Sequence, residues 1–218
     1  ADLITTKKAA ADRYRKMGFG TVLSHQYDGV LRGTSALAAL NEGDDFMLLL
    51  PEGASHYSFN KGSSKQSYPS SLMGMIALIR QVHFDAKWYA ENQKSTEYNR
   101  SLSAVLETQE LPKIFDAYGT LSQLRADKIG DEFGFQFILK GDGTEYKRIE
   151  DIKATEAPLI VPVKYPKAYD VTDPFATLQL SLSAMKNWEL APQNLRYLNE
   201  AGSCYYCRWF KRRKGLLY

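Results

Sequence analysis

Residues that commonly bind transition metals are scarce in this chain. Its 218 residues include only three histidines and two cysteines, and more than a hundred residues separate the last histidine, His83, from Cys204 and Cys207. A structural zinc site needs two cysteine pairs, or one pair with two nearby histidines. The spacing therefore argues against a zinc site and predicts no metal centre built by this chain alone.

Long apolar runs are also missing. No unbroken apolar segment reaches the roughly 20 residues that cross a bilayer, and the first eight residues lack the basic start and apolar middle of a signal peptide. Apolar side chains still make up 44% of the chain, enough for a sizeable core in one or two domains. We therefore expect a soluble globular protein with no membrane partner, although a signal peptide removed before Ala1 would leave no trace.

Positive charge is concentrated at the C-terminal end. Five basic residues after Glu200 contribute to a formal net charge of +3, so the rest of the chain carries −2. This distribution argues against a nucleic-acid surface spread over the fold. Residues 203–218 are predicted to form a basic aromatic tail, interpreted either as an out-of-frame, non-native end or as a genuine solvated tail. A nucleic-acid binder acting through this tail is a further hypothesis.

Apolar strands alternate with helices in the second half of the chain. Continuous apolar runs at 113–117, 135–139 and 159–163 are separated by helical patterns at 121–133 and 146–153. Such alternation indicates an α/β fold with a parallel sheet covered by helices, either a barrel or a doubly wound sheet.

The first half is less regular. A helix is predicted at 6–17 and a strand at 21–25, which should deliver His25 and Arg32 at its C-terminal end. Residues 54–68 are rich in serine and predict a long loop. Long loops in compact domains often carry function, so His56 and Lys61 are candidates for a ligand site.

Two helices are predicted between these halves. The first follows Pro69, and the second opens at Ser95 and runs to about Gln109. Ser70 and Ser71 are interpreted as residues that cap the first helix. Together the two helices predict an insertion at about 69–109.

Several short motifs occur in a family-like order. They are Gly18-Phe19-Gly20-Thr21-Val22, Phe115-Asp116-Ala117-Tyr118-Gly119, Phe137-Ile138-Leu139-Lys140-Gly141 and Ala157-Pro158-Leu159-Ile160-Val161-Pro162. This order, from about Arg13 to Gly202, resembles the imidazolonepropionase-like branch of the amidohydrolase superfamily. The segments 56–62 and 68–74 look like a signature of a subgroup that is often exported, which implies an exported or periplasmic protein.

The resemblance implies a partial or distorted TIM (β/α)8-type barrel over residues 1–202, with the helical insertion at about 69–109. The first barrel strand would lie before Ala1, and the strand expected after Gly202 is replaced by the tail. We therefore expect an incomplete barrel. Open sheet edges need covering, so a homo-oligomer or missing domains of a parent protein are the expected partners, with a small-molecule ligand.

The resemblance also implies a metal-ligand set that this chain lacks. Such enzymes hold divalent ions with a His-x-His pair, later single histidines, and an aspartate near the last strand. Here Asp116 and Lys140 stand where two of the single histidines are expected, and a protonated lysine cannot coordinate a cation. We predict that Asp116 and Lys140 form an ion pair instead, so this chain has no metal cofactor, and a divalent metal such as zinc is possible only in a full-length parent.

The candidate residues follow from these arguments. His25, Asp116 and Lys140 are catalytic candidates, Arg32, His56 and Lys61 are ligand-binding candidates, and no residue is assigned to a metal. For His25 the alternative is a loop histidine bonded to a nearby carbonyl, and His83 is interpreted as a packed histidine on a helix. The predicted function is that of an amidohydrolase-like protein, from a parent that hydrolyses carbon–nitrogen bonds other than peptide bonds, with this chain inactive alone. The alternative is a non-catalytic ligand-binding or structural domain of a larger protein.

Overall fold

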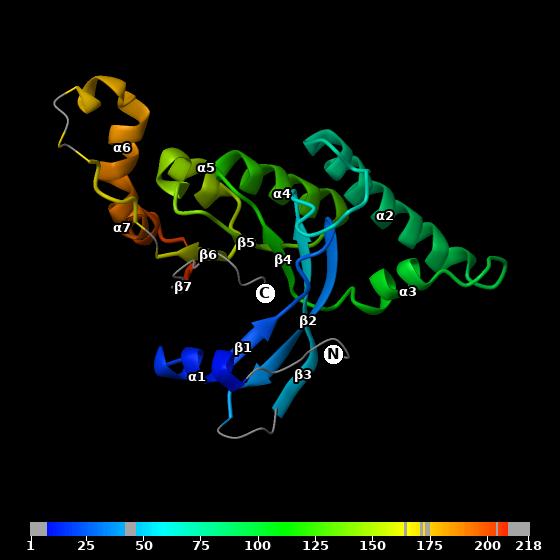
Figure 1. Cartoon of the computed structure of the whole chain (residues 1–218). Helices are drawn as coiled ribbons and strands as arrows, with labels where there is room; N and C mark the ends of the chain where they lie inside the picture. Colours follow the sequence, from blue (N-terminus) through cyan, green and yellow to red (C-terminus); the bar gives the residue numbers. More distant parts are fainter. Residues whose placement is uncertain are drawn as a thin grey trace. The chain divides into compact units, whose positions relative to one another are not determined.

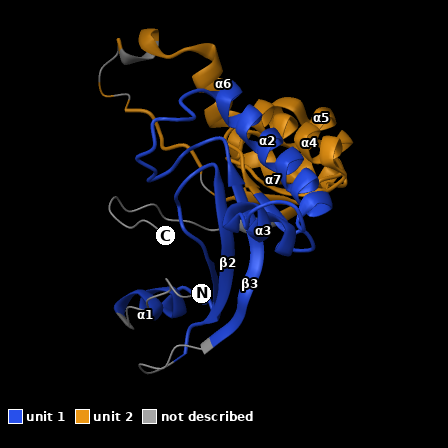
Figure 2. Cartoon of the chain, turned by 90° about the vertical axis from the view of Figure 1, so that its right-hand side faces the viewer, with its two compact units in different colours: residues 1–114, 216–218 blue, residues 115–215 orange. Residues whose placement is uncertain are grey.

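The chain folds into two compact units. In this computed structural model, the structure describes residues 8–41, 47–163, 165–170, 172, 175–203 and 205–208. The described residues up to Ile114 form unit 1, and those from Phe115 onward form unit 2 (Figure 2). None of the helices in these described ranges is both long and apolar enough to cross a membrane.

Unit 1 contains three strands that pair antiparallel. Helix α1 (Lys8–Lys16) is followed by β1 (Thr21–Ser24), β2 (Leu31–Ala39) and β3 (Met47–Ser58) (Figure 1). Strands β1 and β2 pair antiparallel, and β2 and β3 pair antiparallel with several irregularities of register. The first predicted strand is therefore paired antiparallel, and not parallel, with its neighbour.

Two predictions for this sheet were wrong. Residues 54–58 are the end of β3 and not part of a loop, so His56 lies on a strand. The segment is rich in small and polar side chains, which is typical of loops, but Ala54 to Ser58 are all buried. Arg32 lies inside β2 and not in a loop at the end of β1, because Gly29 adopts a φ of +83° where the chain turns back into β2.

Two helices, α2 (Leu72–Asn92) and α3 (Arg100–Glu107), complete unit 1. Ser71 caps α2 by accepting a hydrogen bond from the Gly74 amide at 3.2 Å, which confirms its predicted capping role. The predicted start of the second helix at Ser95 was wrong. Asn99 caps α3 instead, because its side chain accepts from the amides of Ser101 and Leu102.

Unit 2 carries the predicted parallel strands. Strand β4 (Lys113–Asp116) crosses the unit boundary and is followed by β5 (Phe137–Lys140), β6 (Leu159–Pro162) and β7 (Tyr205–Arg208), which neighbour one another in this order. The β5–β6 and β6–β7 pairs are parallel. The connecting helices are listed here in chain order: α4 (Thr120–Phe133), η1 (Glu145–Arg148), α5 (Ile149–Ala154), η2 (Ala176–Gln179), α6 (Leu182–Leu190), η3 (Ala191–Gln193) and α7 (Asn194–Glu200).

Strand β7 corrects the prediction for the C-terminal tail. Tyr205 to Arg208 pair with Leu159 to Pro162, so a strand does follow Gly202. Aromatic residues are good strand formers, but the basic residues of this segment favoured the prediction of a tail over that of a strand. Cys204 and the residues after Arg208 lie outside the described residues.

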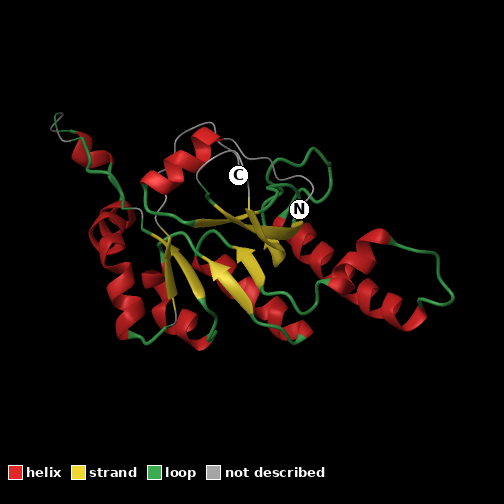
Figure 3. Ribbon diagram, turned by 90° about the horizontal axis from the view of Figure 1, so that it is seen from below, coloured by secondary structure: helices red, strands yellow, loops and turns green. Residues whose placement is uncertain are grey.

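The two faces of the parallel strands differ. Phe115, Phe137, Leu139, Leu159 and Val161 are buried, and the rings of Phe115 and Phe137 meet edge to face at 5.0 Å. Successive strand residues point to opposite faces, so Asp116 and Lys140 emerge on the other face. Figure 3 shows the helices of this mixed α/β chain beside its strands.

Candidate functional site

The predicted ion pair between Asp116 and Lys140 is present in unit 2. Each residue is the last of its strand, and Lys140 Nζ lies 2.9 Å from Asp116 Oδ1. The amide of Ala117 donates to the Lys140 carbonyl at 3.0 Å, which fixes the two strand ends side by side. Asp116 is only 6% exposed, so its carboxylate is largely withdrawn from water.

The donor set at these strand ends does not fit a divalent metal. A cation between Asp116 and Lys140 would have to displace the ammonium group, which has no lone pair when protonated and repels other cations. Within the described residues, no group of three or more histidine, cysteine, aspartate or glutamate side chains is arranged to hold a metal ion. The site therefore supports no step that passes through a bound metal.

A second polar cluster lies in the loop that follows β5. Glu145 is fully buried, and its Oε1 accepts from Gln123 Nε2 at 2.8 Å and from the amides of Asp142 and Gly143. Its Oε2 accepts from Asn194 Nδ2 at 2.7 Å. A buried carboxylate needs such donors, so this cluster fastens the β5 loop to α4 and α7.

The same loop explains Gly141, which directly follows Lys140. A Cβ at Gly141 would lie 1.9 Å from Glu145 Oε1 and 2.7 Å from Gln123 Nε2. Only glycine allows the buried carboxylate to approach the backbone this closely. The position of Lys140 is thus supported by the cluster around Glu145.

In unit 1 the structure brings His25 and His56 together. Their rings stack with centroids 3.9 Å apart and planes 13° from parallel. His25 Nδ1 lies 2.8 Å from the carbonyl oxygen of Gln26, and since a carbonyl only accepts, this nitrogen carries the proton in the bond. This bond agrees with the alternative interpretation, in which His25 is a loop histidine bonded to a nearby carbonyl.

The two cationic candidates in unit 1 bond to main-chain carbonyls. Arg32 is buried, donates to the carbonyl of Asn60 at 3.1 Å, and has its guanidinium 4.0 Å from the centroid of the Tyr27 ring. Lys61 Nζ donates to the carbonyl of Gln66 at 2.7 Å. Both side chains hold the loop after β3 in place, and their role in ligand binding stays a prediction.

His83 on α2 lies beside β3 and the start of β4. Its ring stacks against Tyr57 with centroids 5.9 Å apart. Burial, helped by the positive charge of Lys113, lowers the pKa of His83 to about 4, and burial raises the pKa of Tyr57 to about 12. Both groups are therefore neutral near pH 7, as expected for packed side chains.

The comparisons with known proteins inform only the fold of this chain. No family model and no curated protein matches the chain. The crystal structure of an amidohydrolase from Thermotoga maritima MSB8 matches with a TM-score of 0.63 and 19% sequence identity, over 91% of this chain and 53% of that one. The chain has an amidohydrolase-like fold. It spans about half the length of that neighbour. Its mixed α/β sheet is compatible with a partial TIM-like barrel.

The sequence located part of the polar site at the ends of β4 and β5 and missed the rest. Asp116 and Lys140 were found because the family resemblance places them where metal-binding histidines are expected. Gln123, Glu145 and Asn194 were missed, since nothing near Glu145 in the sequence marks it as buried. The one sequence signal near this cluster is the run Gly141-Asp142-Gly143-Thr144, which is typical of a tight turn. In the structure the Asp142 side chain accepts from the Thr144 amide in that turn.

Proposed function

We propose that this chain is part of an amidohydrolase-like protein, in the imidazolonepropionase-like branch, whose metal centre has been replaced at two strand ends by an ion pair. The parent class hydrolyses carbon–nitrogen bonds other than peptide bonds, and this chain alone does not catalyse that reaction. The observation that carries the proposal is the 2.9 Å separation of Lys140 Nζ and Asp116 Oδ1.

The chemistry of metal-assisted hydrolysis supports this proposal. A divalent ion lowers the pKa of a bound water and polarises the scissile carbonyl, so the reaction depends on the ligands that hold the ion. At the two positions that the family resemblance assigns to histidine ligands, this chain supplies one carboxylate already bonded to an ammonium. Asp116 alone could offer a carboxylate oxygen, but the positive charge beside it opposes a second cation.

Metal analysis and activity measured on the same sample test the proposal. The purified chain is incubated with zinc, manganese or iron(II), dialysed, and assayed by mass spectrometry and against a panel of cyclic and N-acyl amides. We expect metal well below one equivalent and no hydrolysis above the buffer rate. One equivalent of metal that survives dialysis, together with hydrolysis, would show that the centre is intact.

A variant that restores histidines makes the negative result informative. The double substitution Asp116→His with Lys140→His puts two neutral imidazoles at adjacent strand ends, and we expect it to bind more zinc than the parent chain. Asp116→Asn with Lys140→Gln is the matched control, because it removes the same two charges without adding imidazole ligands. Equal zinc binding by both variants and the parent would contradict the assignment of these strand ends as the former metal site.

A further inference from the structure

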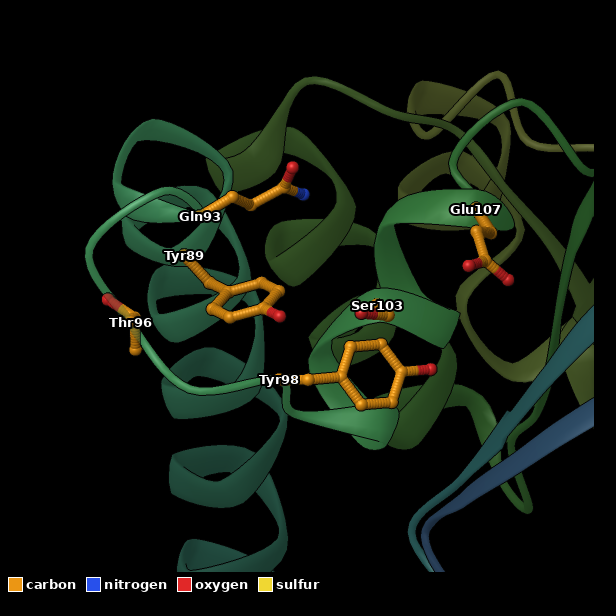
Figure 4. Close-up of a pocket in the computed structure, with 6 residues that line it drawn as sticks. All are labelled: Tyr89, Gln93, Thr96, Tyr98, Ser103 and Glu107. Atoms are coloured by element: carbon orange, nitrogen blue, oxygen red, sulfur yellow. The ribbon is translucent and has the colours of Figure 1, made fainter.

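An open hollow lies between α2 and α3 of unit 1, separate from the residues discussed above. It has a volume of about 380 Å³ and is lined by six side chains, Tyr89, Gln93, Thr96, Tyr98, Ser103 and Glu107 (Figure 4). Ligand pockets typically begin at about 300 Å³. The hollow is thus large enough for a small organic molecule.

Several polar side chains that line the hollow have unused hydrogen-bonding capacity. The Tyr89 hydroxyl accepts from the amide of Asn99 at 3.1 Å. Among the described residues, no protein acceptor takes the proton of this hydroxyl, and the side chains of Ser103 and Glu107 have no hydrogen-bond partner. Tyr89 and Ser103 are buried as residues, and their hydroxyls line the open hollow, where a water molecule or a ligand can complete their hydrogen bonds.

The electrostatics of the hollow favour a positive charge. Glu107 is the only charged residue that lines it, and the faces of the two tyrosine rings carry the negative part of the aromatic quadrupole. The segment from Tyr89 to Glu110 contains four glutamates against one lysine and one arginine. Lys94 and Arg100 are those basic residues, and neither lines the hollow.

We propose that the hollow between α2 and α3 binds a small organic ammonium ion, such as a quaternary or methylated amine. The ammonium group lies against the Tyr98 ring, and Glu107 supplies the opposite charge. The hydroxyls of Tyr89 and Ser103, with the Gln93 amide, bond the polar end of the ligand. Proteins recognise quaternary ammonium groups through the faces of aromatic rings, and a nearby carboxylate adds a Coulombic attraction.

Paired probes test this proposal on the full chain. Choline and its uncharged isostere 3,3-dimethylbutan-1-ol are titrated into the protein and followed by ligand-observed NMR. We expect saturable binding of choline, weaker binding of the isostere, and a loss of choline affinity as salt is raised. Equal affinity for the two probes, or no saturation by choline, would overturn the proposal.

Substitutions locate the binding. Tyr98 is 75% exposed, so Tyr98→Leu should leave the fold intact while weakening choline binding about two- to fivefold. Glu107→Gln should weaken choline binding and leave the affinity for the isostere unchanged. Tyr165→Leu, which changes a half-exposed tyrosine of unit 2, is the matched control and should have no effect. Unchanged choline affinity in both Tyr98→Leu and Glu107→Gln would place the binding elsewhere and refute the assignment.

Discussion

Asn194 Nδ2 donates to Glu145 Oε2 at 2.7 Å and so joins two residues of unit 2 that lie 49 positions apart in the chain. The same asparagine accepts from the amide of Tyr146 at 2.8 Å through its Oδ1. One side chain therefore satisfies both a buried carboxylate and the first turn of η1, and the start of α7 is tied to the loop after β5.

Loss of this asparagine should destabilise unit 2. Asn194→Ala leaves the buried Glu145 carboxylate with one donor fewer and the Tyr146 amide without its acceptor, so we expect a loss of about 1 to 3 kcal/mol in the free energy of unfolding. Urea denaturation measures this loss. Asn199→Ala changes an exposed asparagine on the same helix and should stay within about 0.5 kcal/mol of the parent. Equal losses in the two variants would mean that the contact with Glu145 contributes nothing specific.

The ion pair between Asp116 and Lys140 should show strong coupling. Lys140→Met removes the ammonium group that bonds to the buried Asp116 carboxylate, and we expect a cost of about 3 kcal/mol. The double variant Asp116→Asn with Lys140→Met removes both charges and should cost less than the sum of the single changes, with a coupling of about 1 kcal/mol or more. Urea unfolding of the four proteins of the cycle measures this coupling, and strictly additive effects would contradict the observed contact.

Titration of His83 should make the fold sensitive to mild acid. Burial lowers the pKa of His83 from 6.5 to about 4 in the folded chain. Below pH 6.5 the unfolded chain binds a proton that the folded chain does not take up until about pH 4, so the free energy of unfolding falls across this window. Because the ring is partly exposed, we expect a loss on the order of 1 kcal/mol between pH 7 and pH 5.

The variant His83→Gln isolates this contribution, since it keeps a polar side chain that does not titrate between pH 4 and 7. Thermal unfolding across that range should show a smaller loss of stability in the variant than in the parent chain. Parallel pH profiles for the two proteins would assign the acid sensitivity to other groups.

Gly141 should tolerate no side chain. Gly141→Ala places a methyl group where it overlaps with the side chains of Glu145 and Gln123, so the buried cluster must shift, and we expect a loss of about 2 to 4 kcal/mol. Gly134→Ala is the matched control. Gly134 has a φ of +75°, and a Cβ added there would meet open space. Alanine at this position therefore costs only the backbone strain of a left-handed conformation, about 1 to 2 kcal/mol. A smaller loss at Gly141 than at Gly134, measured by urea unfolding, would be inconsistent with the close approach.

Much of unit 2 could be predicted from the sequence, because its strands are continuous apolar runs and its helices have regular spacing. Asp116 and Lys140 were located differently, because the family resemblance places metal-ligand positions at the ends of these strands. The contacts of Glu145 could not be predicted in this way. Its partners Gln123 and Asn194 lie 22 and 49 residues away, and a local pattern carries no information about such pairings.

Unit 1 was harder to predict for a different physical reason. Ser55, His56 and Ser58 are polar, yet all three are buried in β3. A strand whose buried side chains are polar or small lacks the alternation of apolar and polar residues that marks a half-buried strand. The contacts that stabilise it, such as the amide of Ser55 donating to the carbonyl of Pro112 at 2.8 Å, come from distant segments.

Strand β3 also has a practical consequence for handling the protein. Its second half is buried, whereas Leu48, Leu49 and Leu50 in its first half are each exposed by more than a third. Exposed leucines in consecutive strand positions favour contact between chains when the protein is concentrated. A lysine in place of Leu49 or Leu50 is therefore the first change to make when preparing concentrated samples, because it adds charge to this segment without touching any residue of the proposed sites.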